Sequence, residues 1–205
     1  MALGWSARRE CSRWTSSLSS ELRPFERYDP ARYLATLAYR SADQLPWDLA
    51  AAPAGKALML DTTVYIDAQR GKLPDDLAAR IGSAQIRHSA VALGEIAANI
   101  GLLHPTHPGT AMVTGIVRNT LANADAIRTA APSPDAWLEA SVLSGILART
   151  QGFDRADRRK LLNDALIFLS AAEEDAILIS RNVRDMDLLL QMRPGVQVVL
   201  YKQKP

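Results

Sequence analysis

The chain contains a single cysteine, Cys11, and no apolar run close to the roughly 20 residues that a membrane-spanning helix requires. One cysteine cannot form an intrachain disulfide, and it excludes zinc sites built from several cysteines. Both exclusions fit a reducing compartment. We therefore expect a cytoplasmic protein that makes no contact with a membrane.

A strong excess of one charge is also missing, because 24 Lys and Arg residues oppose 22 Asp and Glu residues and leave a formal net charge of +2. Any affinity for nucleic acid must therefore come from local clusters of charge. The sequence also has no P-loop, no Gly-rich dinucleotide turn and no Gly-x-Ser-x-Gly elbow. Chemistry based on ATP, on NAD or on a serine hydrolase site therefore lacks support.

The first 55 residues differ in composition from the rest of the chain. They hold three of the four tryptophans, Trp5, Trp14 and Trp47. Asp29-Pro30 is a typical helix start, and the helix formers that follow it predict a short helix over residues 30–40. We assign 1–55 to an N-terminal, partly helical extension and 56–205 to the main domain.

The main domain alternates apolar strands with helical patterns. The all-apolar run Ala57-Leu58-Met59-Leu60 is typical of a central strand in a sheet that is covered on both faces. Strands that alternate with helices predict an α/β fold, a three-layer α/β/α domain around a mostly parallel sheet. The predicted strands are 57–60, 85–89, 176–180 and 196–201, and the predicted helices are 75–82, 91–102, 109–129, 135–150, 158–174 and 185–191.

Four acidic residues, Asp61, Glu95, Asp164 and Asp185, stand inside or just after apolar segments. Burying an ionised carboxylate costs several kcal/mol unless something compensates it. A shared site with a divalent metal and oxygen ligands explains several such residues at once. Asp61 and Asp185 also follow predicted strands, and open parallel sheets bind ligands beyond the carboxyl ends of their strands. The pattern indicates metal-dependent phosphodiester chemistry.

Each of these acids lies in a short segment, and the four segments form a recognisable series. They are Leu60-Asp61-Thr62-Thr63-Val64-Tyr65-Ile66-Asp67, Ser89-Ala90-Val91-Ala92-Leu93-Gly94-Glu95-Ile96, Asn163-Asp164-Ala165-Leu166-Ile167 and Ile179-Ser180-Arg181-Asn182-Val183-Arg184-Asp185. In this order they resemble the PIN domain of the VapC-type toxin family, whose members carry an acidic residue in each segment. The resemblance covers roughly residues 57–201 and leaves 1–55 unexplained.

The resemblance implies a metal-dependent endoribonuclease that hydrolyses RNA with Mg²⁺ or Mn²⁺, and it implies that this nuclease is the toxin of a type II toxin–antitoxin pair. The four acids would then form the catalytic, metal-binding quartet, with Asp61 and Asp164 as the main direct ligands. Thr63 and Asn182 would be supporting polar groups that orient water or carboxylate oxygens. A homodimer and a cognate antitoxin that covers the active-site groove are implied as well.

Two choices stay open in the sequence. Asp187 competes with Asp185 as the fourth acid, and mainly the resemblance favours Asp185. The site could also hold one metal or two.

Arginines near the acids are candidates for binding RNA phosphates. Arg181 and Arg184 lie closest to the fourth acid in the sequence. Arg158 and Arg159 begin the predicted helix that bears Asp164. For these two arginines, a solvated helix start is an equally good interpretation.

Two other functions compete with the nuclease. One is a non-catalytic PIN-like module for protein interaction or RNA binding, with 1–55 as an interaction arm, although the presence of all four acids argues against lost catalysis. The other is a phosphotransferase of the haloacid-dehalogenase kind, which also places an aspartate after its first strand. That chemistry needs a second aspartate two residues later, where this sequence has Thr63.

Overall fold

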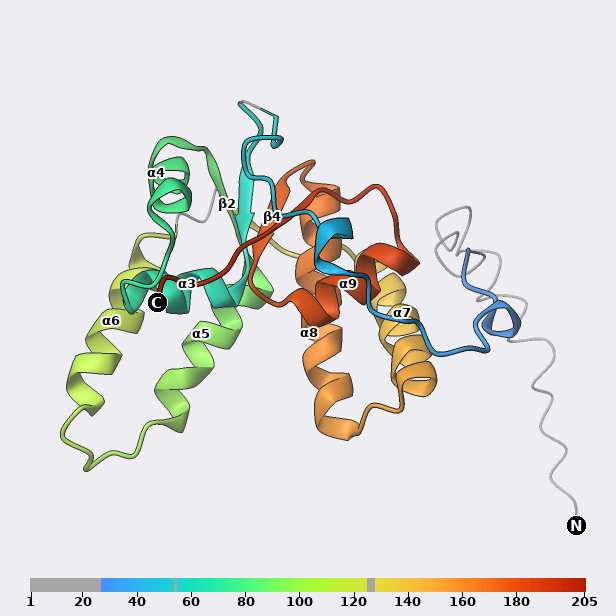
Figure 1. Cartoon of the computed structure of the whole chain (residues 1–205). Coiled ribbons are helices and arrows are strands. Elements are labelled where there is room, and N and C mark those ends of the chain that lie inside the picture. Colours follow the sequence, from blue (N-terminus) through green and yellow to red (C-terminus); the bar gives the residue numbers. More distant parts are fainter. Residues whose placement is uncertain (1–26, 54, 125–127) are drawn as a thin grey trace, which may run out of the picture.

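The computed structural model describes residues 27–53, 55–124 and 128–205 (Figure 1). Within these residues, five parallel strands form one sheet in the order β3-β2-β1-β4-β5. The predicted α/β fold is confirmed, and the sheet is parallel throughout. The strands are β1 (Leu58–Leu60), β2 (Ile86–Ser89), β3 (Thr129–Ala130), β4 (Ile177–Ser180) and β5 (Val198–Leu200).

Helices connect the strands and pack on both faces of the sheet. Crossovers between parallel strands are right-handed, so the reversal of direction after β3 puts the β1–β2 and β3–β4 connections on opposite faces. From these faces α3 packs against β1 and β4, and α8 packs against β4 and β2. The α-helices are α3 (Thr62–Gln69), α4 (Asp75–Ser83), α5 (Ala90–Leu102), α6 (Thr110–Ala122), α7 (Pro134–Gln151), α8 (Arg155–Glu173) and α9 (Val183–Met192).

The neighbouring strands β1 and β4 form the switch point of the sheet. The chain leaves β1 toward one edge and leaves β4 toward the other, which opens a crevice beyond their carboxyl ends. Asp61 directly follows β1, and Ser180 is the last residue of β4. The α5–α6 pair and the α7–α8 pair both extend past this end of the sheet, one on each side of it (Figure 1).

Apolar residues of β1, β4 and α8 form the centre of the core. Every residue of β1 and β4 is buried, as expected for strands flanked on both edges and covered on both faces. Within α8 an unbroken run from Ala165 to Ala171 is buried. In the described part of the chain, no helix combines the length and the hydrophobicity needed to cross a bilayer.

Several predicted helices have different bounds in the structure. The predicted helix 109–129 ends at Ala122, and its last residue instead belongs to the two-residue strand β3, which is too short to leave a sequence pattern. Helix α3 was not predicted, although Asp61 caps its first turn. The remaining differences are one to three residues at helix starts and one residue at helix ends. Asp154 and Asn182 act as N-caps at two of these starts.

The predicted helix over 30–40 is wrong beyond its first turn. Asp29 caps a 3-10 turn, η1 (Pro30–Arg32), and the chain then continues without regular structure to a second short turn, η2 (Ala42–Gln44). Its backbone bonds to the main domain instead of to itself: the carbonyl of Ala38 accepts a hydrogen bond from Gln191. Trp5 and Trp14 of the extension lie outside the described residues.

Candidate metal centre

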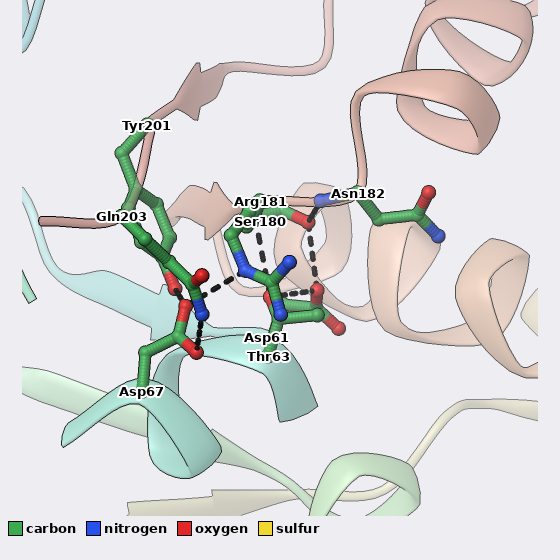
Figure 2. Close-up of polar contacts among 8 residues, drawn as sticks. All are labelled: Asp61, Thr63, Asp67, Ser180, Arg181, Asn182, Tyr201 and Gln203. Atoms are coloured by element: carbon green, nitrogen blue, oxygen red, sulfur yellow. Dashed lines mark hydrogen bonds and ion pairs between the residues drawn. The ribbon is translucent and has the colours of Figure 1, made fainter. Parts of the chain in front are cut away.

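Asp61 lies at the mouth of the switch point and is almost fully buried, with 1% of its surface exposed. Its carboxylate accepts hydrogen bonds from the hydroxyls of Thr63 and Ser180, each at 2.7 Å (Figure 2). It also accepts one from the backbone N–H of Thr62 at 2.7 Å. These donors come from both α3 and β4. The carboxylate is therefore fixed in one orientation at the junction of the two strands.

Glu95 extends from α5 toward the same place. One of its carboxylate oxygens accepts a hydrogen bond from the hydroxyl of Thr62, and the other accepts one from the side-chain amide of Asn163 at 2.7 Å. Thr62 follows Asp61, and Asn163 precedes Asp164. Glu95 therefore joins the first and third predicted segments through residues adjacent to the predicted acids.

Asn182 joins the remaining two acids. Its side-chain nitrogen donates to Asp164 at 3.0 Å and to Asp185 at 2.9 Å, while its oxygen accepts the backbone N–H of Asp185 at 3.3 Å and caps α9. Asp164 stands on α8 and Asp185 on the first turn of α9. The structure thus brings all four predicted acids, together with Thr63 and Asn182, around the end of β1 and β4.

Burial and nearby negative charge raise the pKa values of two of the acids, Asp164 and Asp61. The pKa of Asp164 is raised well above its ordinary value, mainly by loss of water around it and then by the charges of Asp61, Asp185 and Glu95. Burial also raises the pKa of Asp61, although its three hydrogen bonds oppose that shift. Within the described residues, no Lys, Arg or His forms an ion pair with any of the four acids.

Asp187, the alternative fourth acid, points into a different contact. It is buried, and it accepts the backbone N–H of Arg40 at 2.9 Å and the Arg40 guanidinium. Arg40 belongs to the N-terminal extension. The charge of Asp187 is therefore neutralised away from the centre, and Asp185 is the acid of this pair that faces Asp164.

Asp67 is a further buried acid that the sequence reading did not single out. Arg181 pairs with it at 2.8 Å, and Tyr201 and Gln203 donate to it at 2.7 and 2.5 Å (Figure 2). By contrast, the described donors of hydrogen bonds to Asp61 are all neutral groups. Arg181 was predicted to bind phosphate. In the structure its Nε atom donates a hydrogen bond to Asp67.

The other predicted phosphate-binding arginines are placed in two different ways. Arg184 stacks over the ring of Phe153, 4.6 Å from its centroid, and donates to the hydroxyl of Tyr39 in the extension. Arg158 and Arg159 lie on the exposed first turns of α8, facing α7. None of them contacts the four acids directly, so their role in binding RNA stays a prediction.

The donor set fits a hard divalent cation by its chemistry. All four side chains offer carboxylate oxygens, which Mg²⁺ and Mn²⁺ prefer. Among residues 27–53, 55–124 and 128–205, no cationic side chain forms an ion pair with them. In the described residues, no group of three or more His, Cys, Asp or Glu side chains is spaced to hold a metal ion. Mg²⁺ needs fewer protein ligands than that, because it keeps several waters and binds through one or two carboxylates.

Three supporting residues were missed as site residues: Thr62, Asn163 and Ser180. Each lies beside a predicted acid in sequence or at the end of a strand, so adjacency was the available signal. The sequence could not show which acid each of these side chains contacts. The hydrogen bond from Ser180 to Asp61 spans 119 residues, and the one from Asn163 to Glu95 spans 68.

No protein-family model matches the sequence, and no curated protein matches it. Solved structures do match. FitAcB from Neisseria gonorrhoeae is similar at 16% identity and a TM-score of 0.50, over 69% of this chain and 96% of that one. FitAB bound to an IR36 DNA fragment is similar at 17% identity and a TM-score of 0.50, over 70% and 94%. VapBC2 from Rickettsia felis, bound to a DNA fragment from the promoter, is similar at 16% identity and a TM-score of 0.48, over 71% of this chain and 99% of that one.

The chain has the fold of FitAcB and FitAB. Identities of 16–17% carry no residue role from those structures to this chain.

Proposed function

We propose that this chain is a metal-dependent endoribonuclease that hydrolyses RNA phosphodiester bonds. The observation that carries the proposal is the convergence of Asp61, Glu95, Asp164 and Asp185 at the switch point, where no cation of the described residues forms an ion pair with them. Such a cluster is costly unless a bound cation balances it. A site rich in carboxylates that takes a divalent cation is suited to phosphoryl oxygens.

The side chains around the acids have separate tasks in this proposal. Ser180 and Thr63 hold Asp61 in place, and Thr62 and Asn163 hold Glu95. Asn182 keeps the carboxylates of Asp164 and Asp185 close together in spite of their repulsion. A bound Mg²⁺ or Mn²⁺ would supply an activated water and would offset the charge that develops on the leaving oxygen.

We further propose that the protein is the toxin of a type II toxin–antitoxin pair, active as a homodimer and silenced by a cognate antitoxin. Two observations support this role: the resemblance of the four segments to VapC-type PIN domains, and the fold shared with FitAcB. Co-purification of the antitoxin with the chain, and recovery of nuclease activity when the antitoxin is removed, would test it.

The nuclease is tested by incubating the purified protein, free of bound partner, with a pool of structured RNAs in Mg²⁺, Mn²⁺ or EDTA. We expect cuts in either metal that disappear in EDTA and in Asp164→Asn. Asp76→Asn is the matched control, because Asp76 is an exposed carboxylate on α4 away from the centre. Folded wild-type protein that cuts no RNA at any metal concentration would favour the non-catalytic module instead.

A further inference from the structure

A hollow that begins at the acidic centre lies between α5 and the seam that α7 and α8 form. This hollow, of about 540 Å³, includes Glu95 and Asn163 in its wall, and Trp137 of α7 stands beside them with 47% of its surface exposed. Small residues form much of the remaining wall: Ala90, Gly94, Ala98 and Ala131. An exposed indole ring beside small residues offers a surface on which a nucleobase can stack.

A second hollow, of about 430 Å³, lies on the same seam. Ser141, Ser144 and Gly145 of α7 line one side of it, and Arg155, Arg158, Arg159 and Leu162 of α8 line the other. In the described part of the chain, none of the three arginines forms an ion pair. Their charge is therefore available to an anionic ligand.

The two hollows are consecutive parts of one strip. On α7, Trp137, Ser141 and Ser144 follow one another at helical spacing and share a face. On α8, the residues Leu166, Leu162 and Arg158 also share a face, and their numbers fall along the strip while those of α7 rise. From Asn163 to Arg155 the strip is roughly 12 Å long at the rise of an α-helix, which is enough for a few nucleotides.

We propose that this α7–α8 strip binds the single-stranded RNA that flanks the scissile phosphate. A base stacks on Trp137, and the following phosphates contact Arg155, Arg158 and Arg159. Aromatic platforms next to cationic side chains are the usual means of binding single strands. The inference rests on the proposed nuclease function, because the strip starts at Glu95 and Asn163 and so continues directly from the acidic centre.

Binding can be measured apart from cleavage. A short fluorescein-labelled oligoribonucleotide is titrated with protein in EDTA, where no metal-dependent cutting occurs, at several salt concentrations. We expect Trp137→Ala to weaken binding by about tenfold, as loss of one stacking platform does. The double variant Arg158→Ala/Arg159→Ala should weaken binding and reduce the slope of log affinity against log salt by about 1.4, or about 0.7 for each phosphate contact.

Matched controls lie elsewhere on the surface. Arg118→Ala removes an exposed arginine of α6, and Leu102→Ala removes an exposed apolar side chain at the end of α5. Both variants should bind RNA like the wild type. The strip residues to be changed are exposed as well, so equal melting temperatures should accompany the changes in affinity.

The outcomes separate the strip from the nuclease. Wild-type protein that cuts RNA, with unchanged RNA affinity in both strip variants, would overturn the strip and keep the nuclease. If the wild type never cuts RNA but the strip variants lose RNA affinity, the nuclease is overturned and the strip is kept. If the strip variants lose affinity for a co-expressed partner protein and keep their RNA affinity, the strip is a protein-docking surface, and the inference is wrong.

Discussion

Two groups of buried or partly buried acids occur in this domain, and they differ in what neutralises them. Asp67, Asp187 and Glu139 each form an ion pair with an arginine: Arg181, Arg40 and Arg193, respectively. In the part of the chain that the structure describes, the four acids at the switch point receive hydrogen bonds only from neutral groups: the backbone, hydroxyls and side-chain amides.

In the proposed function, this difference separates structural charges from functional ones. A buried acid with its arginine is already compensated, and removing one partner leaves the other uncompensated. An acid cluster without a cation is destabilised in the folded protein by mutual repulsion and by loss of water. A protein that maintains such a cluster loses stability at that place, as binding and catalytic sites commonly do.

Substitution of one acid from each group tests the contrast most strongly. Asp67→Ala should lower the free energy of unfolding by about 3 kcal/mol, because Arg181, Tyr201 and Gln203 all lose their acceptor. Asp164→Ala removes a carboxylate that repels its neighbours, so stability in EDTA should stay the same or rise. Urea denaturation at pH 7 measures both variants.

A loss of stability in Asp164→Ala as large as that in Asp67→Ala would abolish the distinction between the two groups. Asp67→Asn provides a second test, because it retains an acceptor for Tyr201 and Gln203 and removes only the charge. It should fall between the wild type and Asp67→Ala.

Activity should show the opposite ranking. Asp61→Asn should reduce RNA cleavage by at least about 100-fold, since loss of even an outer-shell partner of a metal ligand costs 10- to 100-fold. Asp187→Asn should cut RNA at close to the wild-type rate per folded molecule, because Asp187 contacts Arg40 and not the centre. Rates normalised by circular dichroism would show this, and equal losses in the two variants would contradict it.

The four acids could be singled out from the sequence because each one interrupts or follows an apolar run, Asp61 and Asp185 after strands and Glu95 and Asp164 within helices. Their role as metal ligands stays a prediction. Asp67 shows the limit of that signal: it is also an acid in an apolar segment, yet its partner Arg181 is 114 residues away. The residues alone left the choice between Asp185 and Asp187 open for the same reason, since Arg40 lies 147 residues from Asp187. The local sequence pattern predicts which acids are buried. Which of them pair with an arginine depends on the fold, because the arginines are distant in the sequence.

The fold divides in a similar way. Long apolar patterns predicted β1, β4 and α8 to within a few residues. The segment after Pro30 has helix-forming residues but packs on α7 and α9 in an extended path, held by bonds such as that from Thr36 to the carbonyl of Thr150. Tertiary contacts there outweigh local helix propensity.

Asn182 offers a smaller test of the unpaired group. Asn182→Ala should lower metal affinity by about 10- to 100-fold, because Asp164 and Asp185 lose their shared donor. It should also cost about 1 kcal/mol of stability through loss of the α9 cap. Ser133→Ala is the control, since Ser133 caps α7 at a distance from the acids.

Ser133→Ala should reproduce the loss of stability and leave the affinity for Mn²⁺ unchanged. Should both variants bind Mn²⁺ alike, Asn182 acts only as a helix cap.

The smallest effect concerns pH. The pKa of Asp164 is raised above its ordinary value of 3.8 in the folded protein, so between the two values the folded state holds more protons than the unfolded state. The free energy of unfolding should therefore fall as pH rises through that window, by about 1.4 kcal/mol for each unit of elevation. Asp164→Asn lacks this dependence, so urea denaturation in EDTA should show its stability advantage growing from pH 4 to pH 7.5. A constant difference between the two proteins would contradict the repulsion described here.

The measurement that bears most directly on the two groups of acids is calorimetric titration with Mn²⁺ of metal-free wild type, Asp164→Asn and Asp187→Asn, without RNA. The unpaired acids should bind Mn²⁺ in the wild type and in Asp187→Asn, and the binding should be lost or greatly weakened in Asp164→Asn. If Mn²⁺ does not bind to folded wild-type protein, or binds equally to all three proteins, the unpaired acids are not a cation site.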